Sequence, residues 1–215
     1  QANLINHTAV RELATIAKTK NIKLIHISTD FVFNGLNKKP YTENDATSPL
    51  NIYGETKLAG EKAVMSISKS NSLIIRTGWV YSEFGNNFLK TILNLAKKND
   101  ILDIVSDQFG TPTYAYDLAF LILHIITTDK FLQNNKSSEI LHYSNEGKSS
   151  WYDFAKEIIG ISGINCQLNP IGARDYPLAA KRPKYSILSS KKVSEEYDVS
   201  IKHWKEALKI CLKNL

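Results

Sequence analysis

The sequence predicts an α/β fold built around a parallel β-sheet, and three observations lead to this prediction. Segments with apolar residues at helical spacing alternate along the chain with short apolar runs, which is the order typical of parallel sheets. Those runs are rich in β-branched residues and nearly continuous, as in strands that are buried on both faces. The 215 residues are also sufficient to bury a large core.

The first part of the chain contains two predicted strands, each flanked by predicted helices. Apolar spacing predicts a helix over residues 3–20, and the run IKLIHIS at 22–28 predicts a buried strand. After a polar loop, a Ser-Pro pair is expected to begin a helix over residues 48–69. The run SLIIRTGWVY at 72–81 predicts a second strand that runs into a loop.

The rest of the chain continues the alternation with shorter elements. The expected helices span 87–98, 115–128, 150–160, 190–197 and 202–213, and the expected strands span 101–105 and 140–143. The composition changes near residue 80. We therefore expect residues 1–80 and 81–215 to form two parts, with the helix near 115–128 packing back on the sheet of the first.

Composition argues against several classes of protein. Hydrophobic residues make up 43% and charged residues 22% of the chain, which is typical of globular proteins, and no apolar run is long enough for a membrane span. The net charge of +6 is spread thinly, so we expect an anionic small molecule or an acidic partner segment rather than a nucleic acid. Two distant cysteines, Cys166 and Cys211, suit a reducing compartment, and we expect a cytoplasmic protein.

The stretch SPLNIYGETKLAGEKAV at 48–64 contains a candidate proton-transfer pair. Tyr53 and Lys57 are four positions apart and therefore share one face of the predicted helix. A tyrosine has a pKa of about 10 and is a poor proton donor or acceptor at neutral pH, unless a nearby cation lowers this pKa. Spacing alone decides nothing, because Tyr152 and Lys156 have the same separation.

The surroundings of Tyr53 distinguish it from Tyr152. The preceding strand ends in Ser28-Thr29-Asp30, which brings hydroxyls and a carboxylate to the carboxyl edge of the sheet, where open α/β sheets bind ligands. Trp79 ends the next strand at the same edge, either to stack on a ring or to fill the core. Further along the chain, Asn87 is expected either to cap the next helix or to bind a diphosphate at the N-terminus of that helix. Tyr152 has no such edge before it and is expected not to be catalytic.

Other chemistries lack their motifs in this sequence. The five histidines have no metal-ligand spacing, so we expect no metal site. Neither a nucleophile elbow nor a P-loop is present.

Five segments, in order along nearly the whole chain, point to a family. They are STDFVFNG at 28–35, SPLNIYGETKLAGE at 48–61, RTGWVY at 76–81, DQFGTPT at 107–113 and RDYPLAAKRPKYSILSSKK at 174–192. Together they resemble the dTDP-4-dehydrorhamnose reductase family of the extended short-chain dehydrogenases. The resemblance implies a Rossmann-like doubly wound parallel sheet with a smaller C-terminal lobe. Residues 1–80 would be the C-terminal half of the nucleotide-binding domain with the catalytic motif, and 81–215 mainly the substrate-binding lobe.

The resemblance also implies the reaction, which is reduction of the C4 ketone of a nucleotide-linked 4-keto-6-deoxy sugar by NADPH or NADH. Tyr53 would donate the proton to the C4 oxygen, and Lys57 would lower the tyrosine pKa and bind the nicotinamide ribose, so that both contact the cofactor. Thr29 would act with them by hydrogen-bonding the same sugar oxygen. The other expected substrate contacts are Asp30, Trp79, Asn87 and Arg182, the last of which has a salt bridge within the lobe as its alternative.

The sequence departs from the family at two points. Its ten glycines form no G-x-G-x-x-G or G-x-x-G-x-x-G turn, so the N-terminal strands and the pyrophosphate site are expected to lie outside this chain. We therefore expect little or no cofactor affinity from these residues alone. Gly78 stands where the family commonly has serine, a change expected to alter only a loop hydrogen bond.

Three functions remain open from the sequence. The leading one is reduction of dTDP-4-dehydrorhamnose to dTDP-L-rhamnose, and the second is a bifunctional epimerase/reductase acting on a UDP-4-keto sugar. The third is a non-catalytic subunit similar to the regulatory subunit of methionine adenosyltransferase. The intact Thr29, Tyr53 and Lys57 favour an enzyme. A homodimer is a further expectation.

Overall fold

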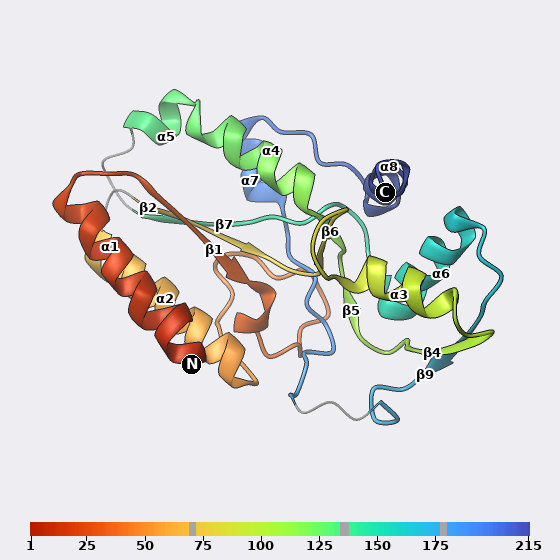
Figure 1. Ribbon diagram of the computed structural model, residues 1–215. Helices are drawn as coiled ribbons and strands as arrows, with labels where there is room; N and C mark the ends of the chain where they lie inside the picture. Colours follow the sequence, from red (N-terminus) through yellow and green to blue (C-terminus); the bar gives the residue numbers. More distant parts are fainter. Residues whose placement is uncertain (69–71, 134–137, 177–179) are drawn as a thin grey trace.

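A computed structural model gives the fold for residues 1–68, 72–133, 138–176 and 180–215 (Figure 1). At its centre, β1 (Leu24–Thr29), β2 (Ser72–Thr77) and β7 (Glu139–His142) form a three-stranded parallel sheet in the order β1-β2-β7. Every residue of the middle strand β2 is buried, which explains its continuous apolar run. The predicted parallel α/β sheet is confirmed.

One layer of helices covers the first face of this sheet. It consists of the π-helix η1 (Leu4–Thr8), α1 (Ala9–Thr19) and α2 (Ile52–Ser68), which Figure 1 shows side by side. Buried residues of α1 and α2 pack against Ile74 of β2; they are Val10, Ala14 and Val64. The helix is where the spacing of apolar residues predicts it, but most of those residues do not face the sheet: Leu4, Leu13 and Ile16 are 64%, 56% and 55% exposed. The buried face of α1 is formed by Val10, Ala14 and Ala17.

A second layer covers the opposite face and consists of α4 (Ala115–Ile126) and α7 (Lys191–Tyr197). The buried residues of this core come from both helices and from β2 and β7; they include Leu73, Ile75, Leu118, Leu121, Ile125, Leu141 and Val193. The sheet therefore lies between two helical layers, as in a doubly wound fold.

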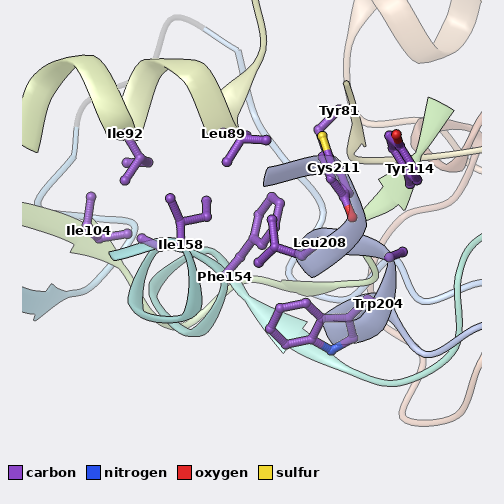
Figure 2. Close-up of a cluster of buried hydrophobic side chains, with 12 residues drawn as sticks. Tyr81, Leu89, Ile92, Ile104, Tyr114, Phe154, Ile158, Trp204, Leu208 and Cys211 are labelled. Carbon is purple, nitrogen blue, oxygen red and sulfur yellow. The ribbon is translucent and has the colours of Figure 1, made fainter. Parts of the chain in front are cut away.

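A separate hydrophobic core lies beside the central sheet (Figure 2). It is built mainly from α3 (Phe88–Ala96), α6 (Trp151–Ser162) and α8 (Trp204–Lys213). Its twelve buried residues are Tyr81, Leu89, Ile92, Ile104, Tyr114, Phe154, Ala155, Ile158, Trp204, Ala207, Leu208 and Cys211. We propose that this core belongs to the lobe expected within residues 81–215, although α4, β7 and α7 of that range pack with the central sheet.

Short strand pairs surround this second core. Strand β4 (Ile101–Val105) pairs in parallel with β9 (Gln167–Ile171). The remaining short elements are η2 (Asp30–Val32), β3 (Val80–Tyr81) paired with β6 (Thr113–Tyr114), β5 (Phe109–Gly110) paired with β8 (Ser149–Ser150), and α5 (Asp129–Gln133). Within the described ranges, no helix is long and apolar enough to span a membrane.

One helix begins four residues later than the sequence predicts, and the predicted strand at 72–81 runs into a loop as expected. Helix α2 begins at Ile52 rather than at the Ser48-Pro49 pair, because the side chain of Asn51 accepts a hydrogen bond from the backbone N–H of Gly54 at 2.9 Å and so caps the first turn. Strand β2 ends at Thr77, and Gly78 with Trp79 separates it from β3. Trp79 has φ = 51°, a left-handed conformation that a strand does not contain.

Candidate active site

Tyr53 and Lys57 lie on the first two turns of α2, close to the carboxyl end of β1. The phenol ring of Tyr53 is 47% exposed and meets the ring of Phe31 edge-on, with the ring centroids 5.8 Å apart. Lys57 is half-buried, and its Nζ donates a hydrogen bond to the backbone oxygen of Ile27 at 2.6 Å. The tyrosine is therefore accessible, and the lysine is fixed to the neighbouring strand.

Thr29 and Asp30 end β1 beside this pair. Thr29 Oγ1 donates to Asp30 Oδ1 at 3.1 Å and accepts from the backbone N–H of Phe31 at 3.2 Å, which caps η2. Asp30 is only 2% exposed, and within the described residues its Oδ2 has no hydrogen-bond partner. Burial raises the pKa of Asp30 to about 6, against the lowering effect of hydrogen bonds from Ser186 and Thr29. A buried carboxyl with a free oxygen lies at the expected ligand edge.

The pKa of Tyr53 is raised rather than lowered. Burial is the main cause, the Thr29 hydroxyl opposes it, and the negative charge of Asp30 adds to it. The expected lowering by Lys57 is not found in this arrangement, in which the ammonium group bonds to Ile27. A raised pKa keeps the phenol protonated at neutral pH, and a proton donor needs that form.

Gly78 touches the carboxyl group of Asp30. A Cβ atom at position 78 would lie 2.5 Å from Asp30 Cγ and 2.7 Å from each carboxyl oxygen. Real Cβ atoms do not approach so closely, and the neighbour is buried. The expectation that a glycine here alters only a loop hydrogen bond is therefore wrong: the glycine makes room for the Asp30 side chain.

Trp79 reaches the same edge, but its ring lies between other protein groups. It is half-buried and stacks on Trp151, with ring centroids 3.4 Å apart and an interplanar angle of 1°. Gly110 packs on the indole, and the backbone N–H of Thr113 donates to the carbonyl oxygen of Trp79 at 3.1 Å. These contacts hold a left-handed backbone that costs on the order of 1 kcal/mol or more. Contact of Trp79 with substrate stays a prediction.

Asn87 caps α3. Its Oδ1 accepts from the backbone N–H of Lys90 at 3.2 Å, and its Nδ2 donates to the carbonyl oxygens of Ser82 at 2.8 Å and Phe84 at 3.2 Å. Both polar atoms of the side chain are therefore used within the loop. The predicted cap is observed, and the alternative contact with substrate stays a prediction.

A groove of about 490 Å³ opens next to the N-terminal end of α2. Leu50 lines it, together with residues 34–36 and Gln108. Four cationic side chains line it as well: Arg174, Lys181, Arg182 and Lys184. No aspartate or glutamate is among its described lining residues, so the groove favours an anion.

Arg182 is exposed at this groove, and within the described part of the chain it forms no ion pair. The segment that carries it is fixed at two points. Asn51 Nδ2 donates to the Lys181 carbonyl oxygen at 2.8 Å, and Gly35 packs against Pro183, where a Cβ would lie 2.6 Å from the proline Cβ. The arginine predicted to bind substrate therefore stands close to the helix that carries Tyr53.

Tyr152 and Lys156 lie elsewhere, on α6. Tyr152 packs against the second hydrophobic core, and Lys156 lines a different surface groove with Asp153 and Glu157. The two pairs with equal spacing are thus placed in different surroundings.

Sequence reasoning missed several residues of the groove. The missed cations are Arg174, Lys181 and Lys184, and the missed neutral residue is Gln108. All four lie in the segments DQFGTPT and RDYPLAAKRPKYSILSSKK, so the resemblance marked the segments but not the residues. Only the fold brings the two segments together.

Comparison with known proteins decides the family. The sequence model of the family described as "RmlD substrate binding domain" matches residues 1–215, the whole chain. The chain belongs to this family. A dTDP-4-dehydrorhamnose reductase of Escherichia coli is 40% identical over 220 residues, covering 100% of this chain and 73% of the relative. A dTDP-4-keto-6-deoxy-D-glucose reductase of Streptomyces niveus is 34% identical over 208 residues, covering 96% of this chain and 70% of the relative.

A solved structure of the family agrees with the fold. The dTDP-4-dehydrorhamnose reductase of Bacillus anthracis, crystallised in complex with NADP, has a TM-score of 0.91 and 34% identity to this chain. The match covers 99% of this chain and 73% of that one. The predicted family and fold class are therefore confirmed.

The residues of this RmlD-family chain fit one end of a nicotinamide cofactor. The ammonium group of Lys57 has three N–H donors, and the structure pairs it with the Ile27 carbonyl oxygen, so further donors are available for ribose hydroxyls. The exposed phenol of Tyr53 lies one helical turn away. The chemistry of this donor set suits the nicotinamide ribose.

Proposed function

We propose that this protein is a reductase that converts dTDP-4-dehydrorhamnose, or a closely related dTDP-4-keto-6-deoxy sugar, to the corresponding 4-hydroxy sugar. The observation that carries the proposal is the position of the proton-donor pair: Tyr53 and Lys57 stand at the carboxyl end of β1, beside Thr29 and next to a groove lined by four cations. The names of the relatives from Escherichia coli and Streptomyces niveus support this substrate class.

Three residues of the chain have separate roles in the reaction. Tyr53, whose raised pKa keeps its proton at neutral pH, gives that proton to the C4 oxygen as the carbonyl double bond is reduced. Thr29 orients the same oxygen through its hydroxyl. Lys57 holds the nicotinamide ribose with the N–H donors that its bond to Ile27 leaves available. When bound, NADPH supplies the hydride that adds to C4.

The groove supplies the binding energy for the rest of the substrate. Arg182 and its three cationic neighbours suit a diphosphate, because guanidinium and ammonium groups form charge-assisted hydrogen bonds with phosphate oxygens. Asp30 is the proposed sugar contact, and because its Oδ2 is covered by protein groups, this contact requires the Asp30 side chain to shift. Asn87 and Trp79 complete the proposed contacts.

The experiment compares two tyrosine variants of the full-length protein. Oxidation of NADPH is followed with dTDP-4-dehydrorhamnose, and with dTDP-4-keto-6-deoxy-D-glucose in parallel. Tyr53→Phe should lower kcat by at least about 100-fold, the contribution typical of a general acid, whereas Tyr152→Phe should retain activity. Equal losses in the two variants would overturn the assignment of Tyr53.

The same measurements address the other readings. Absence of turnover with both sugars, in protein that is folded by circular dichroism, would favour a non-catalytic subunit. Turnover of UDP-4-keto sugars at a comparable kcat/KM would favour the bifunctional enzyme.

A cytoplasmic location and a homodimer belong to the same proposal. Cys166 and Cys211 are both free thiols, which suits a reducing compartment. Light scattering on the purified protein measures the oligomeric state.

A further inference from the structure

A buried ion pair lies below the proposed catalytic residues. Arg76 of β2 donates two hydrogen bonds to Glu61 of α2, from Nη2 to Oε2 at 2.6 Å and from Nε to Oε1 at 2.9 Å. The side chains are 4% and 2% exposed. A buried pair of this kind contributes little net stability, because both ions lose their hydration. Its placement therefore needs another explanation.

The pair joins all three strands of the central sheet. The register places Ser28 of β1 opposite Arg76 of β2, and Arg76 opposite His142 of β7. Ser28 Oγ donates to Glu61 Oε1 at 2.5 Å, and Arg76 Nη1 lies 3.4 Å from His142 Nε2. Glu61 thus receives hydrogen bonds from two strands at once.

His142, the last of these three aligned residues, is neutral. Its pKa is lowered to about 3, mainly by burial and then by the charge of Arg76. Its Nδ1 lies 3.0 Å from the carbonyl oxygen of Tyr41, which requires a proton on Nδ1 and leaves Nε2 to accept from Arg76.

The same carboxylate lies one helical turn beyond Lys57. Lys57 bonds the carbonyl oxygen of Ile27, and Glu61 bonds the side chain of Ser28, so two successive turns of α2 hold two successive residues of β1. The next residue of that strand is Thr29. These contacts fix how far along β1 the helix sits, and therefore where Tyr53 stands relative to Thr29.

We propose that Glu61, held by Arg76, is a positioning residue for Lys57 and Thr29. It sets the register between α2 and β1 and supplies the negative charge that balances the Lys57 ammonium group. The inference rests on the proposed function for its kinetic consequence, but the effect on Lys57 itself is measurable without turnover. The carboxylate raises the pKa of Lys57 against the larger lowering by burial.

Among the residues that the structure describes, few other charged groups lie around Lys57. On α2 it shares a face with Tyr53 and Glu61; β1 contributes His26, whose pKa is lowered to about 4 by burial and then by Lys57. Beyond these, β2 contributes Arg76 through Glu61, and η2 contributes Asp30. The charged side chains of η1 and α1 lie at or near the surface, where His7 bonds Asn3, Arg11 bonds Glu12 and Lys18 is exposed.

The test replaces Glu61 by glutamine, which keeps its shape and removes its charge. Asp117→Asn is the matched control, because Asp117 is 7% exposed and forms an ion pair with Lys202 at 2.9 Å in another part of the fold. Isotope-labelled methyl groups on the lysines report each ammonium pKa by NMR, and a Lys57→Arg sample assigns the Lys57 signal. The measurement is made on the full-length protein.

Glu61→Gln should lower the pKa of Lys57, whereas Asp117→Asn should leave it unchanged. In the enzyme assay, the high-pH limb of kcat/KM should move to lower pH by the same amount, and kcat should fall by up to about 100-fold because the reacting groups are displaced. Glu61→Asp, which keeps the charge on a shorter side chain, should return the high-pH limb of kcat/KM to its wild-type position but restore only part of kcat.

A different outcome overturns the inference. If Glu61→Gln lowers stability as Asp117→Asn does, but leaves both the Lys57 pKa and the high-pH limb in place, the pair is structural only. If Glu61→Gln fails to fold, the double variant Glu61→Gln/Arg76→Gln replaces it, because removing both ions of a buried pair costs less than removing one. A smaller fall in the Lys57 pKa is expected there, because the Arg76 cation is removed together with the carboxylate. Loss of kcat with Lys57 and Thr29 displaced is still expected, and a double variant with the kcat of wild type counts against the proposal. An inactive wild type contradicts the proposed function alone, since the NMR result stands independently.

Discussion

The carboxyl group of Asp30 rests on the backbone of Gly78, where a Cβ atom would come within 2.5 Å of Asp30 Cγ. The first residue follows strand β1 and the second follows β2, and Thr29 and Thr77 just before them are paired in the sheet register. The glycine therefore determines where a buried acid stands, one residue after the proposed catalytic threonine.

Replacement of this glycine should displace the acid. We expect Gly78→Ala to destabilise the protein by ~1–3 kcal/mol, the usual cost of overpacking a close contact. Urea unfolding measures the change. Gly160→Ala serves as control, because its Cβ meets nothing within 4 Å and alanine favours a helix, so a gain of about 0.5–1 kcal/mol is expected. A neutral Gly78→Ala would show that Asp30 moves aside freely.

Asp30 should make stability depend on pH. Burial raises its folded-state pKa to about 6, from an ordinary value of 3.8, so the folded protein binds this proton more tightly than the unfolded chain. The contribution of Asp30 to the free energy of unfolding is fully present below about pH 4. It is lost as the pH rises to about 6, and the loss is on the order of 3 kcal/mol. Asp30→Asn cannot titrate, so the stability of the variant relative to wild type should rise across that interval. Parallel curves from pH 4 to pH 8 would contradict the raised pKa.

The stacked indoles of Trp79 and Trp151 should give an optical signature. Two parallel rings with centroids 3.4 Å apart couple their transitions, so we expect an exciton couplet in the far-ultraviolet circular dichroism spectrum. Trp79→Phe and Trp151→Phe should each abolish it. Trp204 lies in the second core and meets Phe154 at 90°, so Trp204→Phe should leave the couplet in place. Survival of the couplet in Trp79→Phe would argue against the stacked pair.

Arg182 should act on binding more than on chemistry. Removal of one charge-assisted hydrogen bond costs roughly 1.5–3 kcal/mol, so Arg182→Ala should raise KM by about 10-fold or more while kcat changes little. Added salt should raise KM of the wild type more than that of the variant. Arg11→Ala, which removes an exposed arginine paired with Glu12 on α1, should change neither quantity. A fall in kcat with constant KM would place Arg182 in the chemical step instead.

Most of the central fold could be predicted from the sequence, because its signals are local. The continuous apolar run of β2 reports burial of every residue, whereas in β1, also predicted as a buried strand, only Ser28 and Thr29 are fully buried. The predicted strand at 101–105 coincides with β4. Strand β9 escaped prediction because its sequence, QLNPI, is polar and contains Pro170. Because β4 is the one described strand it pairs with, β9 is an edge strand, where the missing N–H of a proline is tolerated.

The candidate site was predictable in part for a related reason. Tyr53, Lys57 and Thr29 belong to short motifs, so their residue types and spacing could be read directly. The contact of Gly78 with Asp30 joins positions 48 residues apart in a geometry that no spacing encodes. The lowering of the Tyr53 pKa was expected from helical spacing, but the side chain of Lys57 turns to Ile27 instead.

The hydrogen bond from Asn51 to the Lys181 carbonyl oxygen joins positions 130 residues apart. It fastens the turn that begins the Tyr53 helix to the wall of the groove that carries Arg182. Replacing this wall by that of a relative, in order to change the preferred sugar, would therefore also displace Tyr53, the proposed proton donor. A successful graft would have to transplant the residue at position 51 together with the loop.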